Sequence, residues 1–408
     1  MVEAHLVDDD RSQRLRQQLV RHLVDIGALA SPEWQRAFTE VARHVFVPRV
    51  FVPSADNNGT YTPLDGTDPH QRHAWLEHVY TDDICITQLD GDDTAWQTAL
   101  RQGSVTAAKM TCTSSQPALM ASMLELLAPS DGSRMLEIGT GTGYNAALLA
   151  HRLGSAAVAS LDIDPGLVES ARTNLTQAGY APNLTSGDGA HGWPDCGPYT
   201  HLMATASFPA IPPAWLEQVS HGGTILANLY RPLGGGILVR LTVDAAKGEA
   251  SGHFTTDTAG FMPTRTHESA TAFALYSTIT EEQEQAAPAK HSPLDLTTIL
   301  DDPNARFFLA LLSDLHTIRV RYPHHPEEHW LLTQDGSWAF ATADSDGVTV
   351  RQDGPRRLWD EAQTRYQQWL DLGEPPRHHL GLTVTPEEQY VWYSSPDNSK
   401  RYPLSPPP

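Results

Sequence analysis

The sequence has few cysteines and no long apolar run. Its three cysteines, Cys85, Cys112 and Cys196, are widely spaced and fit neither a disulfide framework nor a metal-ligand pattern. No apolar stretch approaches the ~20 residues of a membrane-spanning helix, and the first residues show no signal-peptide pattern. We therefore expect a cytoplasmic protein with no membrane partner and no bound metal.

Positive charge is scarce as well. The 28 lysines and arginines stand against 49 acidic residues, so the formal net charge is −21. This charge disfavours nucleic acid and anionic membranes as partners. An acidic substrate would have to be held against the overall field by local cations or backbone donors. The 408 residues, 40% of them hydrophobic, are enough for two or three cores, so more than one domain is expected.

The most informative segment is residues 134–145, with the sequence RMLEIGTGTGYN. It predicts a strand, a glycine turn and the start of a helix. Gly139, Gly141 and Gly143 allow the backbone to turn tightly and to approach a ligand, and the helix behind them presents unpaired N–H groups. This pattern is typical of a nucleotide-cofactor loop. A nicotinamide site and a plain helix-capping turn remain as alternatives.

Charge distinguishes between the possible cofactors. Glu137 should place a carboxylate at the mouth of the loop, which suits the α-ammonium of S-adenosylmethionine better than a pyrophosphate. Asp162 follows the apolar run 156–161 at the end of a second expected strand, where an acid can bind both ribose hydroxyls. We therefore expect an S-adenosylmethionine site on an α/β, doubly wound, Rossmann-like sheet.

Periodicity and capping patterns outline the other elements. Helices are expected over residues 13–29, 34–41, 117–127, 165–178 and 304–315. Strands are expected near residues 202–205, 224–229, 338–341 and 347–350. Residues 53–111 predict a long irregular region, and residues 280–290 a linker or an exposed helix. The proline-rich end, residues 403–408, predicts disorder.

The sequence resembles the protein L-isoaspartyl O-methyltransferases. The resemblance is close over residues 113–229, weaker back to Leu15, and absent from the C-terminal third. It rests on TSSQP at 113–117, EIGTGTGY at 137–144, GDG at 187–189 with GWP at 192–194, and ATAS at 204–207 before Ile211-Pro212. The family implies a class I methyltransferase fold and S-adenosylmethionine as cofactor.

The resemblance also implies roles for individual residues. Asp162 should bind the ribose and Asp188 the adenine amino group, while Thr113 and Ser115 should hydrogen-bond the acceptor carboxylate. Ser115 matches the family's main active-site hydroxyl. The other expected site residues are Ser114 on the acceptor side and Thr140, Tyr144, Asn145, Ile163, Gly189 and Thr205 on the cofactor side.

Structural alternatives exist for several of these residues. Thr113 or Ser115 could be a helix N-cap, and Asp188 could be an ordinary turn residue. Tyr144 and Asn145 could simply pack at the start of a helix.

Departures from the family's pattern direct the functional hypothesis. The family's Asp after Pro-Tyr is Thr200 here, the segment from Tyr80-Thr81-Asp82 to Thr113 is far longer than in repair enzymes, and a module follows Met262. The last two features resemble enlarged homologues from lanthipeptide, lasso peptide and graspetide biosynthesis. Those enzymes methylate an aspartate in a cyclised precursor peptide, which leads to aspartimide or isoaspartate.

The leading hypothesis is therefore an S-adenosylmethionine-dependent O-methyltransferase, active as a monomer, that esterifies an aspartyl side chain in a ribosomally made peptide. The alternatives are repair methylation of isoaspartyl-containing proteins and a non-catalytic peptide-binding subunit. Three domains are expected: N-terminal helices and substrate-side loops over 1–115, the cofactor-binding core over 116–262, and an α+β peptide-recognition domain with a disordered tail over 263–408.

The C-terminal module contains two patterns with a tempting functional interpretation. Residues 325–329, HPEEH, have the spacing of a metalloprotease motif, but Pro323 and Pro326 disfavour a helix, so a polar loop is expected. Five tryptophans could anchor a peptide, although core packing is the favoured interpretation for each. They are Trp330, Trp338, Trp359, Trp369 and Trp392.

Overall fold

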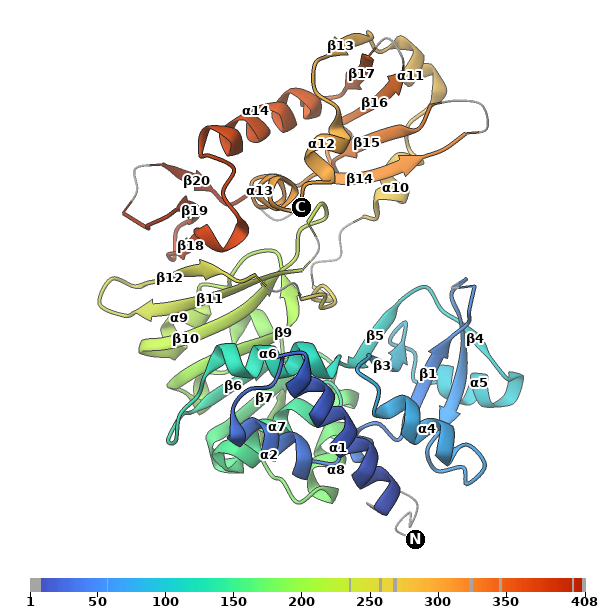
Figure 1. Cartoon of the computed structure of the whole chain (residues 1–408), viewed down its shortest axis with the longest axis vertical. Helices are drawn as coiled ribbons and strands as arrows, with labels where there is room; N and C mark the ends of the chain where they lie inside the picture. Colours follow the sequence, from blue (N-terminus) through green and yellow to red (C-terminus); the bar gives the residue numbers. More distant parts are fainter. Residues whose placement is uncertain are drawn as a thin grey trace. The chain divides into compact units, whose positions relative to one another are not determined.

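The computed structural model forms two compact units. One comprises Met1–Thr205 with Glu217–Leu226, and the other comprises Ala206–Leu216 with Ala227–Pro408. Figure 1 shows the elements of both, coloured along the sequence. The three-domain division expected from the sequence remains a proposal. The structure describes residues 9–56, 58–234, 236–256, 259–266, 270–322, 326–344, 347–397 and 400–405.

The first unit contains the expected cofactor-type sheet. Its strands are β6 (Met135–Ile138), β7 (Val158–Asp162), β8 (Asn183–Ser186), β9 (Tyr199–Phe208) and β10 (Val219–Leu229), and β9 and β10 each contribute residues to both units. The order is β10-β9-β6-β7-β8, with β6 parallel to β7 and β9. The chain runs outward from β6 to β8 and then returns to the other side of β6. Ligands bind at the carboxyl ends of strands where the order reverses in this way. The α/β, Rossmann-like class is confirmed.

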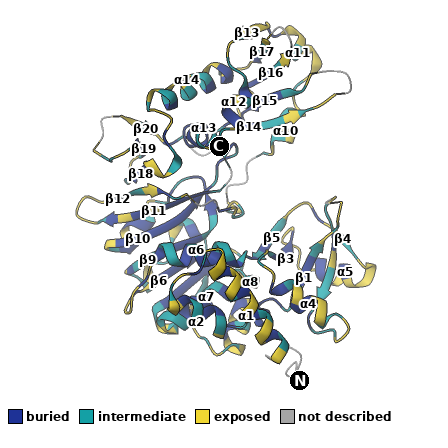
Figure 2. Cartoon of the chain, in the orientation of Figure 1, coloured by how far each residue is buried: buried dark blue, intermediate teal, exposed yellow. Residues whose placement is uncertain are grey.

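The helices of this region are α1 (Asp10–Asp25), α2 (Pro32–Glu40), α3 (Arg43–Phe46), α6 (Pro117–Leu127), α7 (Tyr144–Leu153), α8 (Pro165–Gln177) and α9 (Ala214–Gln218), with short 3-10 turns at Ser155–Ala157, Gly189–His191 (η2) and Pro194–Cys196. The helices α1, α2, α6, α7 and α8 lie close to their predicted positions, whereas the short helices α3 and α9 were not predicted, and α9 contributes residues to both units. In α1 the leucines at helical spacing, Leu19 and Leu23, are buried. Figure 2 shows the strands mostly buried, whereas α1 keeps an exposed outer face.

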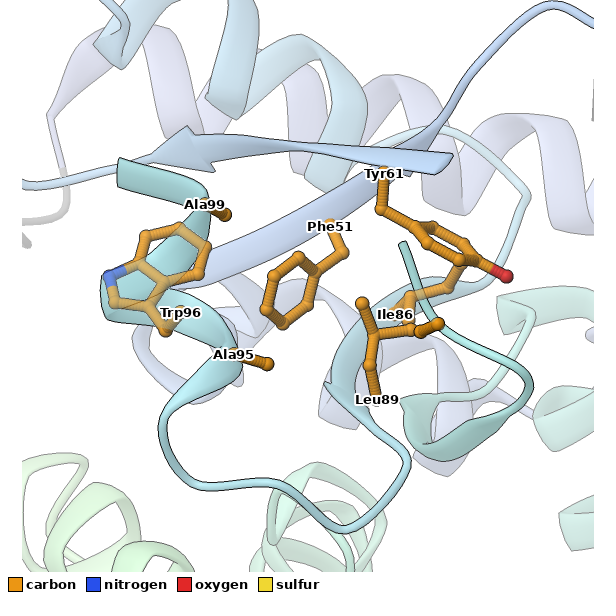
Figure 3. Close-up of a cluster of buried hydrophobic side chains, with 8 residues drawn as sticks. Phe51, Tyr61, Ile86, Leu89, Ala95, Trp96 and Ala99 are labelled. Carbon is orange, nitrogen blue, oxygen red and sulfur yellow. The ribbon is translucent and has the colours of Figure 1, made fainter. Parts of the chain in front are cut away.

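Residues 53–111 form an ordered sheet with two helices, so the expectation of an irregular region is wrong. The elements are β1 (Arg49–Pro53), β2 (Thr60–Asp65), α4 (Arg72–Val79), β3 (Cys85–Leu89), α5 (Ala95–Gln102), β4 (Val105–Thr106) and β5 (Met110–Ser114). The antiparallel strands follow the order β4-β2-β1-β3-β5. Figure 3 shows its core, where Phe51, Ile86 and Trp96 turn toward one another. The strands were missed because they are short and separated by Asp- and Gly-rich turns.

The second unit contains two groups of antiparallel strands. One has the order β20-β19-β18-β12-β11 and the other β13-β17-β16-β15-β14. Their bounds are β11 (Ile237–Asp244), β12 (Glu249–Phe254), β13 (Lys290–Ser292), β14 (His316–Val320), β15 (Glu328–Leu332), β16 (Trp338–Asp344), β17 (Gly347–Asp353), β18 (Leu380–Val384), β19 (Gln389–Tyr393) and β20 (Arg401–Pro403). The helices are α10 (Ala272–Tyr276), α11 (Glu281–Ala286), α12 (Leu296–Leu300), α13 (Pro303–Leu311), α14 (Leu358–Asp371) and the 3-10 turn η4 (Arg377–His379).

The expected C-terminal α+β architecture is confirmed. The core packing favoured for the five tryptophans is also confirmed, since all five are buried. Two other expectations are corrected. Arg401–Pro403 forms β20 and Leu404 is buried, so the chain is ordered to Ser405; residues 406–408 lie outside the described residues. Glu328 and His329 begin strand β15 rather than a polar loop, while His325 lies outside the described residues. No described helix is long and apolar enough to cross a membrane.

Arg231 is a buried cation in the second unit. None of its three guanidinium nitrogens has a hydrogen-bond partner among the described residues. Burial lowers the pKa of Arg231 to about 10, although the charge of Asp314 opposes the shift. A buried cation without an acceptor loses its hydration and destabilises the fold.

We therefore expect Arg231→Met, which keeps the length of the side chain, to raise the free energy of unfolding by about 1–2 kcal/mol. Urea denaturation measures this change. Arg306→Met is the matched control, since Nε of Arg306 donates to the Leu233 carbonyl at 2.7 Å and its loss should destabilise the fold. A lower stability of the Arg231 variant would contradict the prediction.

Candidate active site

The loop after β6 turns on three glycines in the left-handed region. Their φ angles are 101° at Gly139, 50° at Gly141 and 87° at Gly143. A Cβ at Gly139 would lie 2.6 Å from Oγ1 of Thr205. That hydroxyl donates to the carbonyl oxygens of Ile138, at 3.1 Å, and Gly139, at 2.9 Å. Thr205 therefore supports the loop from β9, and its contact with a cofactor remains a proposal.

Glu137 lies deeper than expected. It is fully buried on β6, where Oε1 accepts from Nδ2 of Asn145 at 2.7 Å and Oε2 accepts from Oγ of Ser160 at 2.6 Å. Ser160 Oγ also lies 2.6 Å from Oγ1 of Thr140. The carboxyl group thus joins β6, β7 and α7 beneath the glycine loop and does not stand open at its mouth.

Burial raises the pKa of Glu137 to about 7 from an ordinary 4.5; the charge of Asp162 adds to the shift, and hydrogen bonds from Ser160 and Asn145 oppose it. Because the folded-state pKa is the higher one, this group's contribution to stability is complete below pH 4.5 and is lost as the pH rises through about 7. The wild type should therefore lose about 2 kcal/mol of its free energy of unfolding between about pH 5.5 and pH 7.5, and Glu137→Gln should not show this loss. Urea denaturation at both pH values measures it. Equal pH dependence in variant and wild type would show that Glu137 does not titrate in this window.

Two other residues at the start of α7 have structural roles. Tyr144 is buried, with ring centroids 6.3 Å from Phe38 and 5.7 Å from Phe46. The amide nitrogen of Asn145 donates to the Glu137 carboxyl group. The structure therefore favours the packing interpretation for Tyr144.

The carboxyl edge of β7 presents an acid beside an apolar side chain. Asp162 is 8% exposed; its Oδ2 accepts from the Gly141 N–H at 2.8 Å and its Oδ1 from the Asp164 N–H at 3.1 Å. Ile163, the next residue, is 40% exposed, which is high for isoleucine. A carboxylate against the glycine loop and an open isoleucine match the polar ribose and the flat apolar adenine of a nucleoside.

Asp188 and Gly189 lie after β8. The Asp188 carboxylate accepts from the Ala190 N–H at 2.9 Å and caps η2, and Gly189 is buried. The turn role anticipated for Asp188 is therefore present. One N–H bond leaves the carboxylate with further acceptor capacity, so an adenine contact stays a prediction.

The acceptor segment, residues 113–115, lies at the end of β5 and precedes α6. The N-cap of α6 is Gln116, whose side chain makes no capping bond, so neither Thr113 nor Ser115 is the cap. The hydroxyls of Thr113 and Ser115 have no hydrogen-bond partner among the described residues. Ser114 is buried on the opposite side of the strand, and its Oγ accepts from Nε of Arg43 at 3.4 Å. The expected acceptor role of Ser114 is therefore not supported by its orientation.

This acceptor segment lies directly against the glycine loop. A Cβ at Gly141 would be 3.6 Å from Sγ of Cys112 and 3.8 Å from the carbonyl oxygen of Thr113. Two segments distant in sequence, one with unpartnered hydroxyls and one with a cofactor-type loop, therefore meet at one place.

Two residues at the site, Gln88 and Arg43, gave no signal in the sequence, and Asp82 was noted only as part of the Tyr80-Thr81-Asp82 motif. Asp82 accepts from the Ala118 N–H at 2.8 Å and thereby caps α6. Gln88, on β3, donates to Oδ2 of Asp164 at 3.0 Å and so joins the N-terminal sheet to the start of α8. Arg43, on α3, donates to the carbonyl oxygen of Ser115 at 3.0 Å. These contacts span many residues, and only the folded chain shows them.

Comparison with known proteins gives a consistent result. The family model described as protein-L-isoaspartate(D-aspartate) O-methyltransferase matches residues 94–238. The protein-L-isoaspartate O-methyltransferase of Methanospirillum hungatei JF-1 is 30% identical over 213 residues, which are 52% of this chain and 77% of that protein. That of Anaeromyxobacter dehalogenans 2CP-1 is 43% identical over 116 residues, which are 28% of this chain and 54% of that protein. The chain thus spans about half the length of the second relative.

A solved structure of a protein-L-isoaspartate O-methyltransferase has the same fold. It is 21% identical, covers 93% of this chain and 100% of its own, and has a TM-score of 0.52. Its coverage includes most of the C-terminal third, so a similar fold extends beyond Met262 in that structure. With a relative 30% identical over 77% of its length, the chain belongs to the protein-L-isoaspartate O-methyltransferase family.

Proposed function

We propose that the chain is an S-adenosylmethionine-dependent O-methyltransferase that esterifies isoaspartyl carboxylates in proteins or peptides. One observation carries the proposal. The unpartnered hydroxyls of Thr113 and Ser115 lie in a segment whose backbone approaches Gly141 of the glycine loop. Hydrogen-bond donors for a carboxylate and a loop for a nucleotide cofactor are therefore adjacent.

The residues at the carboxyl edge of the sheet fit S-adenosylmethionine. The glycine loop keeps side chains away from the ligand, Asp162 would bind the ribose hydroxyls, and Ile163 would cover one face of the adenine. Asp188 and Gly189 would meet the adenine edge. The bound cofactor supplies a methyl group already activated for transfer.

The acceptor side needs little acid–base chemistry. A carboxylate is ionised at neutral pH, so no general base is required. The protein must align the acceptor oxygen with the methyl carbon and exclude water. Neutral hydroxyls suit this task, because they orient the anion without the direct ion pair that would weaken its nucleophilicity.

Relatives with a stated activity favour isoaspartyl over aspartyl acceptors. Both relatives described above are named protein-L-isoaspartate O-methyltransferases. The peptide-biosynthesis hypothesis drew on a C-terminal module whose fold is also present in a solved enzyme of this name. The long segment between Asp82 and Thr113 remains as support for the peptide-biosynthesis hypothesis.

Two synthetic peptides that differ only in an isoaspartyl or aspartyl linkage test the proposal. We expect methyl transfer from S-adenosylmethionine to the isoaspartyl peptide, with kcat/KM at least about 100-fold higher than for the aspartyl peptide. Preference for an aspartyl residue within a cyclised peptide would instead support the peptide-biosynthesis alternative. Cofactor binding without methylation of any peptide would indicate a non-catalytic binding subunit.

A further inference from the structure

We infer that Arg43 is a positioning residue of the acceptor site, which holds the Ser115 segment in place and supplies the local positive charge that draws in the acceptor carboxylate. This inference rests on the proposed function. It concerns a residue behind the site rather than one that contacts the substrate.

Arg43 donates hydrogen bonds to backbone carbonyls of the acceptor segment and of residues 79–83. It begins α3 and is fully buried. Its Nη2 donates to the carbonyl oxygens of Ser115 at 3.0 Å and Ser114 at 3.2 Å. The same Nη2 also donates to the Asp83 carbonyl at 3.0 Å. Nη1 donates to the carbonyls of Val79 at 2.7 Å and Thr81 at 3.2 Å, and Nε donates to Ser114 Oγ at 3.4 Å.

These bonds fix Ser115 from two directions. The carbonyls of Ser114 and Ser115 belong to the link between β5 and α6, and those of residues 79–83 flank Asp82, which caps α6 at Ala118. One planar guanidinium therefore joins the acceptor segment to the residues that hold the following helix. With its carbonyl bound in this way, the backbone of Ser115 is held, which fixes the point from which the hydroxyl extends.

The hydrogen-bond acceptors of Arg43 are all neutral, namely backbone carbonyls and one hydroxyl. Among the described residues no carboxylate pairs with it, although buried cations are ordinarily paired with acids. Its field reaches neighbouring groups: burial raises the pKa of the Cys85 thiol, and the charge of Arg43 opposes that shift. Burial also raises the pKa of Tyr144, again with opposition from Arg43.

A local cation matters here because the whole chain carries a formal charge of −21, which repels an acidic acceptor. Arg43 lies behind the Ser115 carbonyl, and its donors are already occupied. It therefore attracts a carboxylate through space and leaves direct hydrogen bonding to neutral hydroxyls. Attraction should appear in KM, and alignment of Ser115 should appear in kcat.

Arg43→Lys and Arg43→Met separate these two effects. Lysine keeps the charge but has three donors on one nitrogen and cannot hold the same carbonyls. We expect Arg43→Lys to lower kcat about 10-fold and to leave KM for the isoaspartyl peptide nearly unchanged. Arg43→Met should lower kcat at least as much and raise KM about 10-fold, with cofactor affinity little changed in both. Steady-state kinetics and calorimetric titration measure these quantities.

Arg16→Met is the matched control. Arg16 is also buried; it donates to the backbone carbonyl of Thr39 and, at 3.5 Å, to the hydroxyl of Tyr80, and neither residue belongs to the acceptor segment. We expect kcat and KM of this variant within about 3-fold of wild type.

Three results would overturn the inference. They are an unchanged KM in Arg43→Met, equal effects of the Arg16 and Arg43 variants, and a KM increase in Arg43→Lys as large as its loss in kcat. The last result can be read even if Arg43→Met does not fold. A wild-type protein that methylates no carboxylate would overturn the proposed function itself, so the two failures are distinguishable.

Discussion

Ser115→Ala is expected to lower the methylation rate about 100-fold, with cofactor affinity little changed. The Ser115 hydroxyl has no partner among the described residues, and the segment that carries it approaches the glycine loop. Its removal deletes one preorganised donor for the acceptor carboxylate without touching the cofactor edge at Asp162. Single-turnover rates with an isoaspartyl peptide measure the chemical step directly.

Ser114→Ala is the matched control for this experiment. Ser114 is the neighbouring serine, but its hydroxyl is buried against Arg43 through a long 3.4 Å contact. We expect a rate within about 5-fold of wild type. An unchanged rate in the Ser115 variant would remove that residue from the mechanism, and an equal loss in both variants would indicate a general disturbance of the segment.

Asp162→Ala is expected to weaken S-adenosylmethionine binding by roughly 1.5–3 kcal/mol. The variant loses the charge-assisted bonds to the ribose, and it also loses the bond that Oδ2 accepts from the Gly141 N–H. Calorimetric titration with the cofactor and its demethylated product measures the change.

Asp162→Asn separates the two contributions of this residue. The amide oxygen can still accept from Gly141, while the charge and one ribose acceptor are lost, so we expect an intermediate affinity. Full affinity in the alanine variant would exclude Asp162 from the cofactor site. Tight binding of a nicotinamide dinucleotide, with none of S-adenosylmethionine, would contradict the assignment of the whole loop.

Local patterns predicted the parts of the fold that local interactions determine. The helix expected over 117–127 is α6 with the same bounds, since Pro117 is placed at its first turn and the apolar face is uninterrupted. The strand–glycine–helix unit follows for a similar reason, because only glycine readily adopts the positive φ angles found at 139, 141 and 143.

The N-terminal sheet could not be predicted in this way. Its edge strand β4 has two residues, and the pairing of β3 with β5 is irregular around Gln88, so no strand shows a clear period. Its stability depends on contacts such as Phe51 with Trp96, 5.3 Å between ring centroids, which only the tertiary fold creates. The turn residues between the strands suggested an irregular loop instead.

The candidate site was predictable where a motif carries it and not where the fold assembles it. Ser115, the glycine loop and Asp162 lie in segments that resemble the family. Arg43 stands in a polar sequence that gives no sign of complete burial, yet it binds residues more than 70 positions away. Glu137 was expected at the mouth of the loop, but its two oxygens are taken by Ser160 and Asn145, contacts that need β7 and α7 in place.

Isoaspartyl methylation is tested most directly by the mass of an isoaspartyl peptide incubated with the protein and S-adenosylmethionine. We expect the peptide first to gain the mass of one methylene group, as a methyl ester, and then to lose methanol to give a succinimide one water lighter than the starting peptide. The matched aspartyl peptide should keep its mass. If the protein binds the cofactor but the isoaspartyl peptide never gains the methyl group, the chain is not an isoaspartyl methyltransferase.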